Sequence, residues 1–416
     1  MGTGVESAPH RRLVGVARLR RASAWPFLLL LSLPLPARAE SFASFDDFAS
    51  RYRAAGTDAR GGLAASFLEW QKTHGGFPIA EGDGSAVLLY FGTGREKDVR
   101  VAGDFRTRQF FSVYWDERGE QMERLAPGGA LFWKRLRLEP DARLDYKFIV
   151  DGEYRLDALN PHVGGGRPVG EVTELAMPGF RQPEEILQRA EVPKGALHAL
   201  DEPWAHPKVQ IYLPPGYDPS RRYPVVYTAD GSGWIRFAGL PTVLDNLVAG
   251  RVIRPVIAVM IDAAEDRSDW YFFNSSYLAY LERVVEYVDA HYSTLKEPAG
   301  RLHIGTSAGG RAALHVGLER PNLFSNLGLF SASLVGAPHY YEPYFTGKKR
   351  PDQRLRIWLS AGSYEGYIRE DARTMEAYFR SVGVPTRAVY THEGHNWGTW
   401  RHLTKEMLRY FFPYRD

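Results

Sequence analysis

The stretch that decides the fold covers residues 302–316 and has the sequence LHIGTSAGGRAALHV. Its first three residues predict a short β-strand, and residues 311–316 predict a helix. Between them lies Ser307, flanked by two glycines whose lack of a Cβ permits a sharp turn. A serine at such a strand-to-helix turn has an exposed hydroxyl oxygen, so the stretch predicts a serine nucleophile. An ordinary turn with a helix-capping serine is the alternative.

The residues on both sides of this turn alternate between apolar strand patterns and amphipathic helix patterns. Strands are expected at Val209–Leu213, Pro224–Ala229, Pro255–Ile261, Leu302–Ile304, Leu327–Phe330, Leu355–Leu359 and Arg387–Tyr390. Helices are expected at Tyr277–Tyr292, Asp371–Val382 and Trp400–Phe411. Such alternation favours an α/β fold in which a mostly parallel sheet is covered by helices on both faces.

Two further positions near the ends of predicted strands carry groups that could activate the serine. Histidine is the natural base for a serine because its ordinary pKa lies near neutrality. His395 follows the last predicted strand, within a Gly-His-Asn-Trp sequence. The acid that orients a catalytic histidine should follow an earlier strand, and Glu365 lies in such a loop. Asp371 and Glu370 are the alternatives, although helix capping explains Asp371 without catalysis.

The same turns supply candidates for an oxyanion hole, which needs two backbone N–H donors. One donor is expected from Ala308, directly after the serine, and the other from Gly231 or Ser232 after an early strand. The sequence His392-Glu393-Gly394-His395 could suggest a metal site, but its glycine disfavours the helix that would bring the two histidines to one face. Neither a metal nor a cofactor is expected.

The N-terminal half has a different pattern, with helical spacing at first and short β-like runs afterwards. The Asp151-Gly152 dipeptide between two of these runs predicts a hairpin. Short strands at such spacing predict a β-sandwich of about 100 residues. Trp115, Trp133 and Tyr146 are expected in its core, with a carbohydrate-stacking platform as the alternative. The expected domains are a signal peptide (1–39), a helical lead-in (40–75), a β-sandwich (76–182), a linker (183–207) and a catalytic domain (208–416).

Composition and charge exclude several classes of function. The chain has 416 residues, and its 44% hydrophobic and 24% charged residues are typical of a soluble globular protein. It contains no cysteine, so disulfides, thiolate metal sites and a cysteine nucleophile are excluded. The formal net charge of +3 comes from the arginine-rich first 39 residues, and the remainder is slightly acidic. There is therefore no electrostatic reason to expect nucleic-acid binding.

Residues 1–39 have the features of a secretory signal peptide. Five arginines precede an uncharged and largely apolar run from Ala22 to Ala37, and Ala37-Arg38-Ala39 matches a small-x-small cleavage pattern. The mature chain would then begin at Glu40 and be periplasmic or secreted, by the general or the twin-arginine route. The run is short and interrupted by prolines, which disfavours a transmembrane helix, and no other stretch predicts a membrane span.

The motifs of the second half resemble those of an esterase family of α/β-hydrolases that includes enterochelin esterases, feruloyl esterases and esterase D. The matching stretches are residues 226–231 (VYTADG), 305–310 (GTSAGG), 361–365 (AGSYE) and 393–397 (EGHNW). The resemblance implies an α/β-hydrolase fold with the catalytic residues in the order serine, acid, histidine. Because the acid of this family follows a turn of small residues, the resemblance favours Glu365 over Asp371.

The first half resembles the N-terminal domain of enterochelin esterases. The matching stretches are residues 76–81 (GFPIAE), 101–105 (VAGDF), 144–148 (LDYKF) and 157–162 (DALNPH). Some of them are also similar to the early-set carbohydrate-binding domain of glycogen-branching enzymes. This resemblance implies an immunoglobulin-like β-sandwich.

Together these features predict an exported serine esterase of the enterochelin esterase type that works through a Ser-His-Glu triad and an acyl-enzyme. Arg267, Trp397 and Trp234 are expected to bind substrate, with Arg236 and Arg311 as further cations for an anionic siderophore. A feruloyl or acetyl esterase that acts on polysaccharide, with a glycan on the β-sandwich, is one alternative. A non-catalytic glycan-binding protein is the other.

Overall fold

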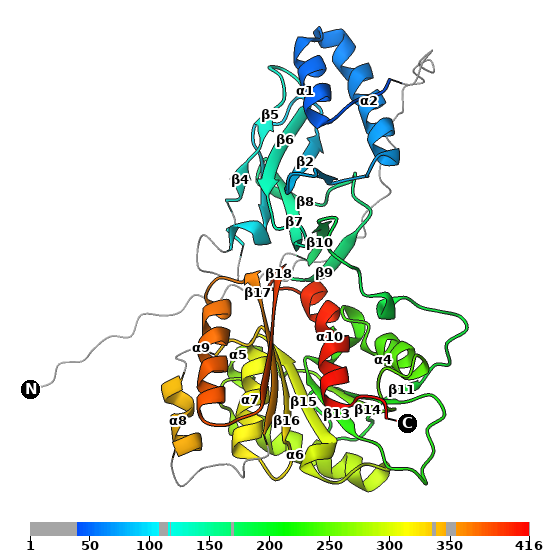
Figure 1. Cartoon of the computed structure of the whole chain (residues 1–416), viewed down its shortest axis with the longest axis vertical. Helices are drawn as coiled ribbons and strands as arrows, with labels where there is room; N and C mark the ends of the chain where they lie inside the picture. The colour runs from blue at the N-terminus through cyan, green and yellow to red at the C-terminus, as the bar shows by residue number, and fades with distance from the viewer. Residues whose placement is uncertain are drawn as a thin grey trace, which may run out of the picture. The chain divides into compact units, whose positions relative to one another are not determined.

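A long, mostly parallel β-sheet forms the centre of the second half of the chain (Figure 1). Its strands follow the spatial order β11-β12-β14-β13-β15-β16-β17-β18, and only the pairs β11–β12 and β12–β14 are antiparallel. Strands β13, β14 and β16 are buried along their whole length, as expected for parallel strands covered on both faces. The bounds are β11 (Ala196–Ala199), β12 (Val209–Leu213), β13 (Val225–Ala229), β14 (Ile257–Ile261), β15 (Arg301–Thr306), β16 (Asn326–Phe330), β17 (Arg356–Tyr364) and β18 (Thr386–Gly394).

The computed structural model describes residues 40–107, 115–116, 118–167, 170–334, 338–346 and 355–415. The predicted signal peptide, residues 1–39, lies outside this described part. Within the described ranges, no helix combines the length and the apolar character that crossing a bilayer would need.

Helices cover both faces of the central sheet and enclose two hydrophobic cores. One core contains residues from α6, α7, α8 and α9, and the other contains residues from α3, α4 and α10 (Figure 1). The predicted α/β architecture is thereby confirmed. The helices are α3 (Gly231–Arg236), α4 (Leu240–Ala249), α5 (Arg267–Trp270), α6 (Ser275–His291), α7 (Ala308–Glu319), α8 (Pro338–Thr346), α9 (Tyr367–Ser381) and α10 (Trp397–Phe411), with short 3₁₀ turns η2 (Glu184–Ile186) and η3 (Pro298–Gly300).

Several elements begin or end where the sequence pattern did not place them. Helix α9 begins at Tyr367, so Asp371 lies inside the helix and does not cap it. Helix α10 begins at Trp397 because the Asn396 side chain accepts a hydrogen bond from the backbone N–H of Thr399. The segment expected as a linker, residues 183–207, contributes strand β11 to the edge of the sheet.

The first half contains two antiparallel sheets and two helices. One sheet has the order β1-β2-β6-β5, and the other is built around β7, which pairs with β3, β8 and β10. The helices are α1 (Phe45–Ala54) and α2 (Thr57–Thr73). The remaining bounds are β1 (Ile79–Ala80), β2 (Ser85–Phe91), β3 (Val99–Gly103), η1 (Asp104–Arg106), β4 (Glu120–Gln121), β5 (Glu123–Arg124), β6 (Leu131–Arg137), β7 (Arg143–Val150), β8 (Glu153–Arg155), β9 (Val163–Arg167) and β10 (Gly170–Ala176).

Strand β2 shows how these layers are held together. Ala86 and Leu88 pack in the core shared with strands of the second sheet, whereas Val87 and Leu89 pack against residues of α1 and α2. Because successive side chains of a strand point to opposite faces, a run that is apolar throughout is buried on both sides. Trp115 and Tyr146 are buried, which confirms the expected core packing of these two aromatic residues.

A buried arginine joins the two halves of the unit that spans Ser41–Asp416. Arg143, at the start of β7, pairs in the sheet with Glu393 of β18. Its guanidinium lies 2.8 Å from Asp145 and 2.5 Å from Glu174, and it donates a 2.5 Å hydrogen bond to the Asn396 side chain. Burial alone would lower the pKa of Arg143, but the neighbouring carboxylates raise it above its ordinary value. The cation is therefore an integral part of the junction.

We expect the substitution Arg143→Met to lower the free energy of unfolding by about 3–5 kcal/mol, because it leaves buried carboxylates without their cation. Urea unfolding of the purified protein would measure the loss. Arg137→Met is a suitable control because the Arg137 side chain is 82% exposed. Equal effects of the two substitutions would contradict the structural role of Arg143.

Candidate active site

Ser307 occupies a strained turn between β15 and α7. Its φ angle is +56°, in the left-handed region that residues other than glycine rarely adopt. The turn is tight because a Cβ atom on Gly305 would lie 2.2 Å from the carbonyl oxygen of Gly309. Helix α7 begins directly after the serine, at Ala308. The expected strand–serine–helix turn is therefore present.

A buried carboxylate and an imidazole form a hydrogen-bonded pair at neighbouring strand ends. Glu365 follows β17 and is fully buried, whereas His395 follows β18 and its side chain is 12% exposed. Glu365 Oε1 lies 2.9 Å from His395 Nδ1, and Glu365 Oε2 accepts a 2.6 Å hydrogen bond from the backbone N–H of Gly362. Both oxygens of the Glu365 carboxylate therefore have a hydrogen-bond partner. Because Nδ1 of His395 contacts Glu365, its other ring nitrogen, Nε2, is available to a different group.

The sheet brings the serine to the same edge as this pair. Strands β15, β16, β17 and β18 are parallel neighbours, so the residues that follow them lie along one carboxyl edge. At the end of β16, Ser331 accepts a 3.0 Å hydrogen bond from the Trp400 indole, whose ring meets the His395 ring edge-on at 5.3 Å. Among the described residues, neither Ser307 Oγ nor His395 Nε2 has a hydrogen-bond partner.

Two backbone amides at this edge are placed at the first position of a helix. Ala308 begins α7 and Gly231 begins α3. The N–H groups in the first turn of a helix have no carbonyl acceptor within that helix. Ser232 differs, because its N–H donates a 2.6 Å hydrogen bond to the Asp262 carboxylate. The structure therefore disagrees with the expectation that Ser232 is an oxyanion donor, while Ala308 and Gly231 remain candidates.

Arg267 links two segments of the site. Its guanidinium makes two 2.7 Å hydrogen bonds to the carboxylate of Asp230, the residue before Gly231. It also lies 3.3 Å from the carbonyl oxygen of Thr306, the residue before the serine. The expected role of Arg267 as a free cation for substrate is therefore not supported, because Asp230 balances its charge.

The two tryptophans expected to bind substrate differ in their surroundings. Trp234 is fully buried and packs edge-on against Phe330 and Trp397, so the expectation that it contacts substrate is wrong. Its burial depends on partners from distant parts of the chain. Trp397 is 9% exposed and lines a cavity.

This cavity, of about 220 Å³, lies between the beginning of α10, the end of α3 and strands β9 and β10. Its lining combines the aromatic rings of Trp397 and Phe237 with the guanidinium groups of Arg236 and Arg401. Arg401 lies 3.6 Å from Glu174, whereas Arg236 has no ion-pair partner among the described residues. The carboxylates of Asp145 and Glu171 also line the cavity, and Asp145 is paired with Arg143. The cavity therefore combines apolar surface with charges of both signs, among which the arginines outnumber the carboxylates.

The third candidate cation, Arg311, is buried and supports nearby loops. It lies 3.4 Å from the carbonyl oxygens of both Tyr271 and Ser333, and burial lowers its pKa. Its guanidinium also stacks over the exposed ring of Phe272. These contacts give Arg311 a structural role at the start of α7.

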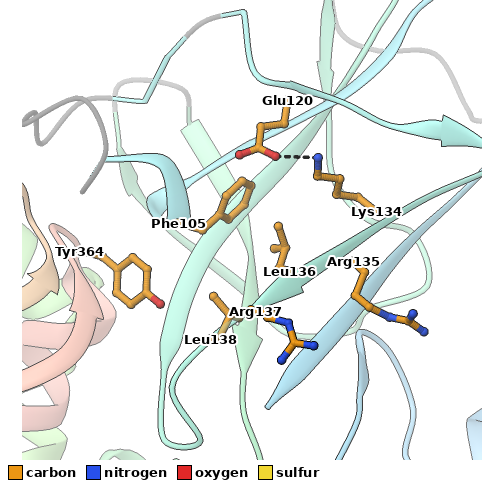
Figure 2. Close-up of a pocket in the computed structure, with 8 residues that line it drawn as sticks. All are labelled: Phe105, Glu120, Lys134, Arg135, Leu136, Arg137, Leu138 and Tyr364. Atoms are coloured by element: carbon orange, nitrogen blue, oxygen red, sulfur yellow. Dashed lines mark ion pairs between the residues drawn. The ribbon is translucent and has the colours of Figure 1, made fainter. Parts of the chain in front are cut away.

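A second cavity, of about 370 Å³, lies beside the acid-bearing strand, and Figure 2 shows the side chains of Tyr364 and Phe105 directed toward it. Its charged side chains are paired: Lys134 lies 2.8 Å from Glu120, Arg135 contacts Glu81, and Arg137 lies 3.9 Å from Asp83. It therefore adds no free charge to the candidate site.

The other histidines near His395 have partners of their own. His392 Nδ1 lies 2.6 Å from Asp141, and His402 Nδ1 lies 2.8 Å from Glu393. Across the described ranges, no group of three or more metal-binding side chains is placed to hold an ion.

Three polar residues that support this site were not singled out from the sequence as functional. Asp104, Arg143 and Asn396 form a buried network that reaches the loop of His395. In the sequence, the Gly-Asp-Phe stretch at 103–105 indicates only a resemblance to other domains.

Comparison with known proteins identifies the family of the second half of the chain. Residues 203–411 match the model of a family described as "Putative esterase". The chain is 24% identical over 222 residues to the uncharacterized protein YjcH of Bacillus subtilis, a match that covers 48% of this chain and 88% of that protein. It is 25% identical over 222 residues to an endo-1,4-beta-xylanase/feruloyl esterase of Xylanibacter ruminicola, covering 49% of this chain and 29% of that enzyme.

Solved structures share the fold over more of the chain. The ferric enterobactin esterase of Salmonella typhimurium superposes with a TM-score of 0.68 at 18% identity, over 83% of this chain and 98% of that chain. The enterobactin esterase of Shigella flexneri, solved in the presence of enterobactin, gives a TM-score of 0.67 at 19% identity, over 82% and 97%. The chain belongs to the esterase family that its second half matches, and it is a carboxylic-ester hydrolase with the fold of the enterobactin esterases.

Proposed function

We propose that this protein is an exported serine esterase of the enterochelin esterase type. In this proposal Ser307 is the nucleophile, His395 is the general base, and Glu365 orients the histidine. The observation that carries it is the 2.9 Å contact between the buried Glu365 carboxylate and His395 Nδ1, at the sheet edge where the strained serine turn also lies. Such a constellation is recognised by its geometry and not by its order in the sequence.

The proposed reaction has two halves. Ser307 Oγ attacks the ester carbonyl carbon while His395 Nε2 takes the hydroxyl proton, and that proton then passes to the departing alkoxide. The result is an acyl-enzyme and a free alcohol. In the second half a water molecule attacks the acyl carbon, gives a proton to His395, and the proton returns to Ser307 as the acid leaves.

The surrounding groups stabilise the charges that develop in this reaction. The backbone N–H groups of Ala308 and Gly231 would donate to the oxyanion, each typically worth about 10²–10³ in rate. Glu365 would hold the Nδ1–H tautomer of His395 and stabilise the imidazolium. Its complete burial strengthens this electrostatic interaction, because the local dielectric constant is low.

The cavity lined by Trp397 supports an anionic aromatic substrate, such as the ferric complex of a catecholate siderophore. Arg236 would supply unpaired positive charge, and the rings of Trp397 and Phe237 would supply apolar contact. A feruloyl or acetyl ester of a polysaccharide, which lacks such negative charge, is the alternative substrate. Comparing turnover of ferric enterobactin, enterobactin, methyl ferulate and acetylated xylan would decide between these classes.

Export and domain roles are parts of the same proposal. The arginine-rich, apolar leader at 1–39 supports delivery to the periplasm or the exterior. The two antiparallel sheets between residues 76 and 182 support an early-set, immunoglobulin-like domain that precedes a catalytic domain at 208–416. A glycan on these sheets belongs to the alternative substrate.

Replacing the nucleophile tests the proposal directly. We expect Ser307→Ala to lower kcat for p-nitrophenyl acetate by about 10⁴- to 10⁶-fold, because no acyl-enzyme can form. A fluorophosphonate probe should label the unaltered protein at Ser307 and leave the variant unlabelled. Ser381→Ala is a matched control on the exposed end of α9 and should keep full activity. A loss below about 10³-fold in Ser307→Ala would exclude the proposed mechanism.

The choice of acid has its own test. We expect Glu365→Gln to lower kcat by about 10²- to 10⁴-fold, because the neutral amide no longer stabilises the imidazolium. Asp371→Asn, which changes the alternative acid inside α9, should change kcat by less than about threefold. Steady-state kinetics of both variants would measure the difference, and the reverse pattern would assign the acid to Asp371.

The substrate cavity predicts a selective effect on binding. We expect Arg236→Ala to raise KM for ferric enterobactin by about tenfold, the amount that one charge-assisted contact typically contributes. KM for the uncharged p-nitrophenyl acetate should change little. Arg409→Ala, an exposed arginine on α10, serves as the control. Equal changes for both esters would show that Arg236 does not recognise negative charge.

A further inference from the structure

We infer that Asp104, a residue of the first half of the chain, is a positioning residue for His395. This inference rests on the proposed function, since it assigns the support of the imidazole that would act as base. Asp104 is fully buried and begins the η1 turn after β3. It reaches both residues that flank His395 in the sequence, although it lies 292 positions before Asn396.

The Asp104 carboxylate accepts hydrogen bonds from three directions. Oδ2 accepts a 2.8 Å bond from the Asn396 side-chain amide and another 2.8 Å bond from the backbone N–H of Asp145. Oδ1 accepts a 2.9 Å bond from the Trp115 indole N–H. Each of these donors points at an oxygen atom, so these contacts require a hydrogen-bond acceptor at both Oδ1 and Oδ2.

Asn396 transmits this contact to the histidine loop because its side chain can adopt only one orientation. Its Oδ1 atom accepts a 3.1 Å hydrogen bond from the Thr399 N–H, which caps α10, and a 2.5 Å bond from Arg143. Its Nδ2 atom is thereby directed at Asp104. The residue after His395 is fixed at the same time to a helix and to the first half of the chain.

The residue before His395 is fixed by direct packing against Asp104. A Cβ atom on Gly394 would lie 2.2 Å from Asp104 Cγ, so only glycine allows this approach. Gly394 also pairs with Tyr364 between β18 and β17, and Tyr364 directly precedes Glu365. His395 is therefore held between two anchored neighbours.

The first half of the chain contacts the acid strand in the same region. The Thr107 hydroxyl, one turn after Asp104, donates a hydrogen bond to the carbonyl oxygen of Tyr364. Tyr364 and Phe105, which follows Asp104 in η1, line the same cavity (Figure 2) and belong to one hydrophobic core. One short segment of the first half thus supports the backbone next to both Glu365 and His395.

This support has a consequence for rate, because a displacement of about 1 Å in a catalytic group can cost about 10²-fold. We expect Asp104→Asn to lower kcat for p-nitrophenyl acetate by about 10- to 100-fold, with KM within about twofold. The amide can accept through only one of its two terminal atoms, so its NH₂ group would meet a donor and push the loop aside.

A matched variant separates this role from general loss of stability. Asp157 is also a buried carboxylate of the first half, and it accepts a 2.6 Å hydrogen bond from Tyr146. Burial raises the pKa of Asp157 to about 6, so assays at pH 8 are made with the Asp157 carboxyl ionised. We expect Asp157→Asn to keep kcat within about twofold, measured per active site by fluorophosphonate titration. Equal kcat values for the two variants would overturn the inference.

A second variant covers the case in which Asp104→Asn does not fold. Asn396→Ser keeps an oxygen to cap α10 but loses the amide that reaches Asp104. It should lower kcat by a similar factor at unchanged KM. If Asn396→Ser has wild-type kcat, the link from Asp104 to His395 is not functional.

A readout that does not depend on turnover separates this inference from the proposed function. The proton between His395 Nδ1 and Glu365 can be observed by NMR of protein labelled at histidine nitrogen. We expect Asp104→Asn, but not Asp157→Asn, to shift that resonance. An unshifted signal overturns the positioning role, even where Ser307→Ala is inactive. A shifted signal together with a fully active Ser307→Ala would overturn the proposed function alone.

Discussion

The hydrogen bond between Glu365 and His395 is the interaction on which the candidate site depends. A fully buried carboxylate is costly unless its oxygens are satisfied, and here His395 and the Gly362 N–H satisfy them. The pairing of β17 with β18 shifts register between Gly362 and Tyr364. This irregularity lets the Gly362 N–H reach Glu365, whose carboxylate contacts His395 at the end of β18. The geometry of these two strands thus brings the Glu365 carboxylate within hydrogen-bond distance of the His395 ring.

The same edge of the sheet concentrates strain and unsatisfied backbone groups. Ser307 and Asp230 both have positive φ angles, and each directly precedes a helix whose first N–H groups face the edge. Arg267 ties the two turns together through Asp230 and the Thr306 carbonyl. A strained backbone conformation persists only where many surrounding contacts hold it in place. The ion pair between Arg267 and Asp230 is one of these contacts.

Sequence reasoning succeeded where the signal was local and failed where it was not. The turn at Ser307 and the positions of the strands along the chain follow from glycine spacing and apolar runs, which the chain carries within a few residues. Trp234 could not be assigned in this way, because its burial comes from Phe330 and Trp397. The network around Asp104 requires contacts between residues hundreds of positions apart.

The chemical nature of that network explains why the first half can influence precise geometry. Hydrogen bonds are directional, so a buried carboxylate that faces several donors has one favourable arrangement. Arg143 and Asp104 approach Asn396 from the same half of the chain, one as donor and one as acceptor. Moving either partner would break a hydrogen bond between Asn396 and a buried charged group, which is unfavourable. The loop of His395 is therefore held by a specific set of polar contacts, and the first half of the chain becomes part of the structure that defines the site.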